Sequence, residues 1–372
     1  DINIDTSIYS LDISDDGNVV AIGSPSGEPN GRWSGYVKVY ENINNEFIQV
    51  GSDIEGELQF DKYGLNLDLS GDGSVVAIPS LRHESNRDYQ RAYLHVYENV
   101  GGVWSKIGSE IIGEKAIDSP IGYNGVSLSQ DGSIVAIGAI LQTLEGRPSS
   151  YVSIYKNTNN KWTKIASDIN VVEAQYFTSY PSVKISSDGS TVAIGAIEND
   201  GDGEASGHVR VFSISKSESI PDKGNSTENN ASTDISLPEF EWTRLLGTSG
   251  FDRGDALTTG ADGSIYIAGQ TNGDLNDQTN NGGFSDAFIS KFNPDGTQNW
   301  TRLLGTSDSD NATALTTGAD GSIYVAGVTR GDLDGQTNDG GFGDAFISKF
   351  NPDGTKDWTK LLGSSGIDEA QA

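Results

Sequence analysis

The sequence predicts an all-β chain, a β-propeller of six four-stranded blades, and three observations carry this prediction. One sequence unit recurs six times within 372 residues, each unit holds an Asp-Gly turn between two apolar runs, and each supplies four candidate strands. Apolar residues at 35% and 47 glycines favour many short strands over long amphipathic helices. Two other arrangements remain open: four blades of one propeller with the start of a second, or part of a seven-bladed ring.

The first two strands of each unit carry the clearest repeat. Alternating apolar and polar residues lead into Asp-Gly and then a β-branched run, which is a strong hairpin signal. The six copies read LDISDDGNVVAIG from Leu11, LDLSGDGSVVAIP from Leu67, VSLSQDGSIVAIG from Val126, VKISSDGSTVAIG from Val183, LTTGADGSIYIAG from Leu257 and LTTGADGSIYVAG from Leu315. We expect the turn glycines to supply the positive φ that a tight hairpin needs.

Two further strands complete each unit. The third strand begins at Tyr36, Tyr93, Tyr151, His208, Ala287 and Ala345, and the fourth begins near Phe47, Trp104, Trp162, Trp242, Trp300 and Trp358. Four strands in a repeated unit are typical of a propeller blade. We expect the recurring tryptophans to pack between neighbouring blades.

One spacing between units is longer than the others because a Ser/Asn-rich stretch separates the third strand of unit four from its fourth strand. This stretch, 216–239, is predicted to be an insertion into blade four, and a domain linker is the alternative. Ala372 occupies the position that Ala256 and Ala314 hold just before a first strand. The chain is therefore expected to contain a whole number of units.

Two known repeat families are similar to these units. GLNLDLSGDGSVVAIP followed by YLHVYENVGGVWSKIGSEI resembles the FG-GAP, integrin-α-like propeller repeat, and this resemblance covers four blades within 1–215. The segment 240–372 contains the outer strand of blade four and two further blades, and these two blades resemble the bacterial SBBP-type β-propeller repeat, with DGSIYVAGVTRGDLDGQTNDGGFGDAFISKF as the clearest part. Both resemblances imply four-stranded blades of large bacterial surface or extracellular proteins, and neither implies a particular ligand.

Charge and composition exclude several classes of partner. With 24 basic and 53 acidic residues the net charge is −29, which repels nucleic acid and anionic lipid. Cysteine is absent, which excludes disulfides, a thiolate nucleophile and a Cys-based zinc site. No run of about 18 apolar residues is present, so direct membrane insertion is not expected.

Calcium is the candidate cofactor, because polar loops between the second and third strands alternate Asp and Asn with Gly, as oxygen ligands of a hard cation do. Ordinary turn formation is the competing interpretation. No unit contains the complete Asp-x-Asp-x-Asp-Gly-x-x-Asp loop of integrin-like repeats. The candidate ligands are Asp332, Asp334 and Asn338 in unit six, Asp274, Asn276 and Asn280 in unit five, and Asn199, Asp200, Asp202 and Glu204 in unit four.

The equivalent loops of units one to three hold aromatic and basic residues that do not follow the repeat. Equivalent loops of a propeller gather on one face, so a shared ligand surface is predicted there, with ordinary loop variation as the alternative. Its residues are Arg32, Trp33, His83, Arg87, Tyr89 and Arg147. His95, at a variable position of a third strand, is expected to face solvent.

The sequence contains no Gly-x-Ser-x-Gly elbow, phosphate-binding loop or dinucleotide fingerprint in a strand-to-helix setting. We therefore predict no enzyme but a binding or adhesion module of a large secreted or cell-surface bacterial protein, with a protein, a glycan or neighbouring copies as partner. A purely architectural repeat is one alternative. A propeller glycan hydrolase or lyase is another, and it would show unrepeated polar residues around the axis, which the sequence does not obviously offer.

Overall fold

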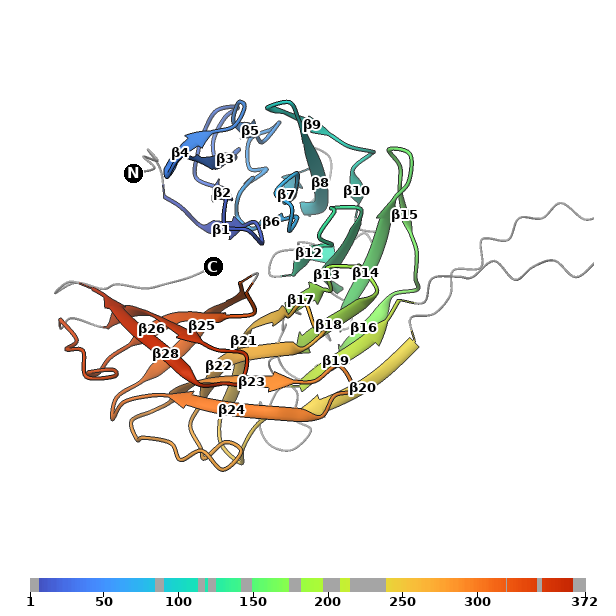
Figure 1. Ribbon diagram of the computed structural model, residues 1–372. Coiled ribbons are helices and arrows are strands. Elements are labelled where there is room, and N and C mark those ends of the chain that lie inside the picture. Colours follow the sequence, from blue (N-terminus) through green and yellow to red (C-terminus); the bar gives the residue numbers. More distant parts are fainter. Residues whose placement is uncertain are drawn as a thin grey trace, which may run out of the picture.

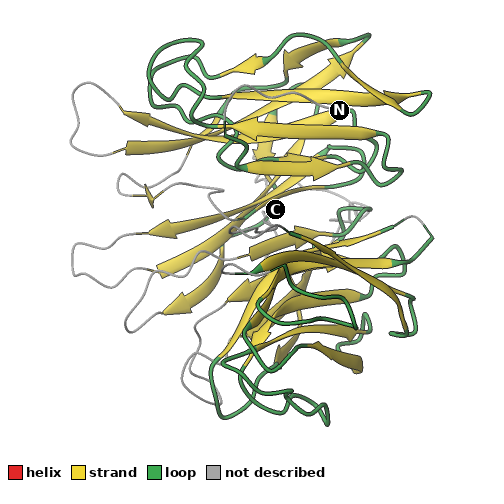
Figure 2. Cartoon of the chain, turned by 90° about the vertical axis from the view of Figure 1, so that its left-hand side faces the viewer, coloured by secondary structure: helices red, strands yellow, loops and turns green. Residues whose placement is uncertain are grey.

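The computed structural model confirms the predicted six-bladed propeller. It describes residues 7–83, 90–112, 118–119, 125–141, 149–173, 182–196, 208–214, 239–318, 320–339 and 343–363. Six antiparallel sheets follow one another around a common axis (Figure 1). Figure 2 shows that the described part of the chain consists of strands and loops and contains no helix. Accordingly, no helix of those residues could cross a membrane.

Each blade is a meander whose first strand lies next to the axis. Blades 1 to 3 contain β1 (Ser10–Ile13), β2 (Val19–Ser24), β3 (Tyr36–Ile43), β4 (Glu46–Gln49) and β5 (Ile54–Glu55); β6 (Asp68–Leu69), β7 (Val75–His83), β8 (Gln90–Val100), β9 (Val103–Lys106) and β10 (Ile111–Ile112); and β11 (Asp118–Ser119), β12 (Val126–Leu128), β13 (Ile134–Leu141), β14 (Ser149–Asn157), β15 (Trp162–Lys164) and β16 (Ile169–Glu173).

Blades 4 to 6 have four strands each. They contain β17 (Ser182–Ile185), β18 (Thr191–Ala196), β19 (His208–Ser213) and β20 (Glu239–Leu245); β21 (Asp252–Thr259), β22 (Ile265–Thr271), β23 (Asp286–Phe292) and β24 (Gln298–Leu304); and β25 (Asp310–Thr317), β26 (Ile323–Thr329), β27 (Asp344–Phe350) and β28 (Lys356–Leu362). In blade 4, β19 pairs with β20 on the far side of the polar segment, with Val211 opposite Trp242.

The Asp-Gly turns have the expected backbone. Gly17 has φ of 73°, and its N–H donates to the carbonyl of Ser14 at 2.9 Å. The Asp16 carboxylate accepts the N–H of Asn18 at 2.9 Å. An Asp side chain thus closes the turn, and the glycine adopts a conformation that costs other residues about 1–2 kcal/mol.

The hydrophobic core lies between successive blades rather than inside any one of them. Ala21, Val37 and Val39 on the trailing face of blade 1 pack against Leu67 and Leu69 on the leading face of blade 2. The same arrangement recurs from blade 2 to blade 6. Each blade therefore depends on its neighbours for burial of its apolar residues, as in other repeat architectures.

The recurring tryptophans bond across these interfaces, and the direction of the bond differs between the two halves. Trp104 and Trp162 donate their indole N–H backward, to the carbonyls of Val50 and Ile107 in the preceding blade, both at 3.0 Å. Trp242 and Trp300 donate forward, to proline carbonyls of the following blade, at 2.9 and 3.2 Å. The structure thus agrees with the expectation that the tryptophans join neighbouring blades.

The first and last blades each keep one open face. β23 and β27 share the sequence Asp-Ala-Phe-Ile-Ser-Lys-Phe, yet all of β23 is buried, whereas Ala345, Ile347 and Lys349 of β27 are only half-buried. Blade 6 covers the trailing face of blade 5, and no described blade covers that of blade 6. On blade 1, Leu11 and Ile13 of the leading face are 45% and 40% exposed.

Candidate functional site

The candidate functional site is a cavity of about 300 Å³ at the propeller axis. Residues from the first strands of all six blades line it. Leu11 and Ile13 of blade 1 form part of its apolar wall, with Tyr324, Ala326 and Ile347 of blade 6. The cavity therefore lies between the polar residues at the axis and the open faces of the first and last blades.

One position of the first strand varies from blade to blade and gathers unlike polar side chains around this axis. In the aligned strands it is Asp, Asp, Ser, Lys, Thr and Thr in chain order. The residues are Asp12, Asp68, Ser127, Lys184, Thr258 and Thr316. A cluster of this kind is what we expected only of a propeller enzyme.

Three of these side chains accept a backbone N–H from the next blade. Asp12 accepts from Leu69 at 2.7 Å, Asp68 accepts from Leu128 at 2.7 Å, and Ser127 accepts from the following inner strand at 3.2 Å. These bonds fix the position of each of the three side chains relative to the axis. The cluster is therefore preorganised by the fold.

Lys184 interacts electrostatically with two of these carboxylates, those of Asp68 and Asp12. Its ammonium lies 2.9 Å from Oδ1 of Asp68, which is 4% exposed. Burial, reinforced by the neighbouring Asp68 carboxylate, raises the pKa of Asp12 to about 6, although Lys184 and two backbone N–H groups oppose the shift. Burial alone would lower the pKa of Lys184, but the carboxylates of Asp68 and Asp12 outweigh this effect and raise the pKa. Asp12 can therefore gain or lose a proton near neutral pH.

A second polar group of the cavity comes from a β-bulge. The register of β21 shifts between Gly254 and Ala256, which leaves Asp255 without a strand partner and turns it into the cavity. Arg253 lies 2.7 Å from Oδ1 of Asp255. Burial raises the pKa of Asp255, and Arg253 and a hydrogen bond from the Asn311 side chain oppose the shift. Asp255 thus brings a further carboxylate to the cavity, held by Arg253 and Asn311.

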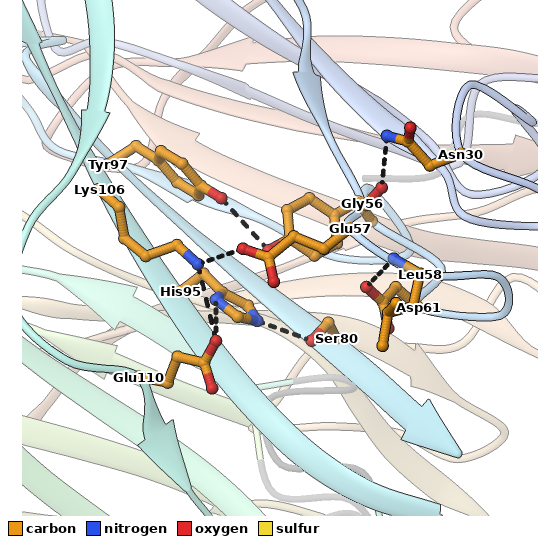
Figure 3. A network of polar contacts seen from close by, with 11 residues as sticks. Asn30, Gly56, Glu57, Leu58, Asp61, Ser80, His95, Tyr97, Lys106 and Glu110 are labelled. Carbon is orange, nitrogen blue, oxygen red and sulfur yellow. Dashed lines mark hydrogen bonds and ion pairs between the residues drawn. The ribbon is translucent and has the colours of Figure 1, made fainter. Parts of the chain in front are cut away.

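A polar network in blade 2 looks catalytic but is sealed. In Figure 3, Nε2 of His95 points to the Ser80 hydroxyl and Nδ1 points to Glu110, which Lys106 also approaches. The two distances are 3.0 and 3.7 Å. Ser80 is 3% exposed and His95 is not exposed at all, so a substrate cannot reach the hydroxyl. The expectation that His95 faces solvent was wrong, because the ring of Tyr63 and the Glu110 carboxylate lie over this side of β8.

The predicted calcium loop of unit six forms a turn held by its own side chains. Asp332 accepts the N–H of Asn338 at 2.9 Å. Asp334 accepts hydrogen bonds from Lys356 and Thr359 and has φ of 52°. Calcium binding by this loop stays a prediction.

The loop of unit five repeats the first of these contacts. Asp274 accepts the N–H of Asn280 at 2.9 Å, and Asn276 donates to Thr301 at 3.2 Å. Among the residues that the structure describes, no three His, Cys, Asp or Glu side chains gather as a metal site. The third predicted cluster lies outside the described residues; it is Asn199, Asp200, Asp202 and Glu204.

The structure describes only part of the predicted ligand surface. Trp33 is 40% exposed and has φ of 55°, and its ring lies 4.4 Å from the Arg32 guanidinium and 5.8 Å from the Lys62 ammonium. A positive φ at tryptophan is a strained conformation, and strain of this kind concentrates at functional sites. Arg87, Tyr89 and Arg147 and the side chain of His83 lie outside the described part of the chain.

Comparisons with known proteins bear on the fold more than on the activity. No protein-family model matches the chain, so the FG-GAP and SBBP resemblances stay predictions. The regulatory protein FlaEY of Caulobacter vibrioides is 29% identical over 143 residues, which are 33% of this chain and 14% of that protein. The chain thus spans far less than the whole length of this relative.

Two solved structures are similar over almost the whole chain. A periplasmic gluconolactonase of Pseudomonas aeruginosa has a TM-score of 0.52 at 15% identity, covering 98% of this chain and 86% of its own. The β-propeller domain of the Trilobed protease from Pyrococcus furiosus, described as an open velcro topology, has a TM-score of 0.49 at 10% identity, covering 97% and 89%. Likeness at such low identity shows the fold alone.

These findings correct one prediction. The prediction that this chain is not an enzyme was wrong, because it rested on the absence of catalytic sequence motifs and of an obvious cluster of unrepeated polar residues at the axis. The structure places Asp12, Asp68 and Lys184 there. The gluconolactonase likeness adds that a fold matching 98% of this chain is compatible with catalysis.

Proposed function

We propose that this chain binds a small, neutral, polyhydroxylated molecule, such as a sugar or a sugar lactone, in the axial cavity. The observation that carries the proposal is the gathering of Asp12, Asp68, Lys184 and Asp255 in one cavity of about 300 Å³ with apolar walls. A concave, mostly apolar site with a few convergent polar groups and perturbed pKa values is typical of ligand sites.

The chemistry of the lining favours a ligand that donates hydrogen bonds. The carboxylates of Asp12, Asp68 and Asp255 are acceptors, and Lys184, the one lysine among the described lining residues, is held by Asp68. An anionic ligand would meet carboxylates without a free cation, whereas hydroxyl groups of a neutral sugar can donate to them. The apolar faces of a sugar ring suit walls such as Leu11 and Tyr324.

Asp12 supports a reaction as well as binding. With a pKa of about 6, its carboxylate can accept a proton from water as that water attacks the carbonyl of a lactone. The same group then returns the proton to the departing ring oxygen. Hydrolysis of a glycosidic bond would need a second carboxylate, and Asp68 is the nearest candidate by its electrostatic influence on Asp12.

The test measures binding and turnover separately. Ligand-detected NMR with neutral monosaccharides, aldonolactones and uronates at pH 7 should show saturable binding of the neutral molecules, and a pH-stat should record acid release from the lactones. Asp255→Asn should weaken binding, and Asp12→Asn should abolish acid release. Glu28→Gln, at an exposed residue remote from the axis, is the control. Absence of saturable binding by all neutral ligands would refute the proposal.

A second candidate function is adhesion through the surface around Trp33. An exposed tryptophan between Arg32 and Lys62 offers an aromatic face and two cations on a chain of strongly negative charge. We propose that this surface binds a protein or glycan partner of an extracellular or cell-surface protein. Trp33→Ala should remove binding on a glycan array or to intact cells, and retention of that binding would exclude Trp33 as its site.

A further inference from the structure

A tryptophan and an arginine of blade 5 hold the turn that joins the last two strands of blade 6. Trp300 of β24 donates its indole N–H to the carbonyl of Pro352 at 3.2 Å, and Arg302 donates from Nε to the carbonyl of Gly354 at 2.8 Å. Gly354 lies against the indole, because a Cβ there would be 2.6 Å from the ring. The contact thus needs a glycine at this place in the turn.

The junction between blades 4 and 5 repeats these contacts. Trp242 donates to the carbonyl of Pro294 at 2.9 Å, and Arg244 donates to the carbonyl of Gly296 at 2.6 Å. A Cβ at Gly296 would again lie 2.6 Å from the indole. Both turns read Asn-Pro-Asp-Gly, and the tryptophans of the two junctions are 6% and 8% exposed. The pair of side chains therefore recognises one kind of turn.

Blade 6 carries a third copy of this pair. β28 has Trp358 and Lys360 where β24 has Trp300 and an arginine. The ring of Trp358 lies 6.3 Å from that of Tyr324 in its own blade, as the ring of Trp300 lies 6.1 Å from that of Tyr266. The angles between the ring planes are 58° and 53°. Each blade therefore orients its own indole in the same way.

The third pair has no turn to hold among the residues that the structure describes. The side chains of Trp358 and Lys360 form no hydrogen bond or ion pair there; the first is only half-buried and the second is exposed. Blade 1 comes next around the axis (Figure 1), and its corresponding turn contains Asn44 and Asn45 without proline or glycine. Blade 1 thus lacks the turn that this pair fits.

We propose that Trp358 and Lys360 form a docking site for the Asn-Pro-Asp-Gly turn of a further blade of the same repeat type. The proline carbonyl of that turn would accept the indole N–H, and its glycine carbonyl would accept a bond from the ammonium. An ammonium on a flexible stem presents its donors less rigidly than a guanidinium, so this junction should be weaker than the two before it.

The rest of the trailing face of blade 6 fits the same partner. Ile347 of β27 is half-buried, whereas Ile289, at the same place in the identical strand β23, is fully buried under blade 6. A docked blade would cover Ile347 as blade 6 covers Ile289. The docking pair lies on the outermost strand of the blade, so this inference does not depend on ligand binding at the axis.

The test supplies the turn within one chain, at high effective concentration, by fusing a copy of residues 315–363 after Ala372. NMR of the indole N–H groups follows Trp358, whose signal is assigned by its loss in Trp358→Phe. In the fused chain this signal should move and exchange with solvent more slowly than in the parent chain. The matched control is a fused copy with alanine in place of its turn glycine, which should leave the signal as in the parent chain.

Lys360→Arg provides a second measurement. It restores the arginine of the earlier junctions, so it should raise the melting temperature of the fused chain and leave that of the parent chain unchanged. A Trp358 signal that is the same in both chains, or an equal effect of Lys360→Arg in both, would overturn the proposal. If the fused chain does not fold, a cyclised hairpin peptide of residues 347–357 is added to the parent chain: saturable movement of the Trp358 signal supports the site, and no movement overturns it.

Discussion

Two isoleucines in identical sequences should differ widely in their effect on stability when each is replaced by alanine. Ile289 in β23 is 0% exposed and packs in the cluster that joins blades 5 and 6, whereas Ile347 occupies the same place in β27 and lines the axial cavity. Loss of a sealed isoleucine side chain costs about 2–5 kcal/mol, partly because a void remains. Ile347→Ala only enlarges an open cavity, so we expect it to cost about 1 kcal/mol.

Urea unfolding followed by tryptophan fluorescence measures this difference. At an unchanged m value, the midpoint should fall clearly further for Ile289→Ala than for Ile347→Ala. Ser290→Ala and Ser348→Ala are the matched control, because each serine is fully buried and bonds a threonine of its own blade, at 2.7 and 2.8 Å. We expect these two variants to lose equal stability.

Equal costs for the two isoleucines would refute the reasoning. Such a result would mean that a sheet covers the trailing face of blade 6 in solution as fully as blade 6 covers blade 5. Unequal costs for the two serines would instead show that the blades differ in general stability, and the isoleucine comparison would have to be corrected for that difference.

Three other predictions follow from the polar residues. Lys184→Met leaves the buried carboxylate of Asp68 without its cation and should cost about 1–3 kcal/mol at pH 7, with most of the loss recovered in the double variant with Asp68→Asn, as urea midpoints can check. The pKa of Asp12 is about 6 in the folded protein and ordinarily 3.8, so its contribution to stability is present below pH 4 and lost as pH rises through 6. The difference in free energy of unfolding between wild type and Asp12→Asn should therefore change by up to about 3 kcal/mol between pH 4 and 7, as a pH series of unfolding curves can measure. Gly305→Ala places a methyl group 2.1 Å from Cγ of Asp286 and should cost about 1–3 kcal/mol by thermal melting; a neutral effect would contradict the position of that carboxylate.

The blades could be predicted because their signals are local. Alternation along a strand and an Asp-Gly turn act within about ten residues, so each hairpin could be read from its own segment, as at Gly17 and Gly321. The repeat then supplied the number of blades. Blade 4 could also be recognised, because strand β20 restores the pattern at Trp242.

The axial site could not be predicted because its members are far apart in the sequence. Asp68 and Lys184 are 116 residues apart and each looks like the polar member of an alternating strand. The available signal was variation, because this position changes from Asp to Ser to Lys while its neighbours stay apolar. The burial of His95 depends likewise on Tyr63 and Glu110, which belong to other segments.

The reversed direction of the tryptophan bonds separates the indole cross-links of blades 1 to 3 from those of blades 4 to 6, although the apolar core continues across this boundary. Trp162 of blade 3 bonds back to blade 2 and Trp242 of blade 4 bonds forward to blade 5, so no described indole N–H crosses between blades 3 and 4. In blade 1, with no described blade before it, Phe47 stands where later units have tryptophan and has no N–H to donate. A recombination event at the boundary between blades 3 and 4 would break none of these bonds. Each set of three blades would keep its own indole cross-links, and only the apolar and backbone contacts between blades 3 and 4 would have to form anew.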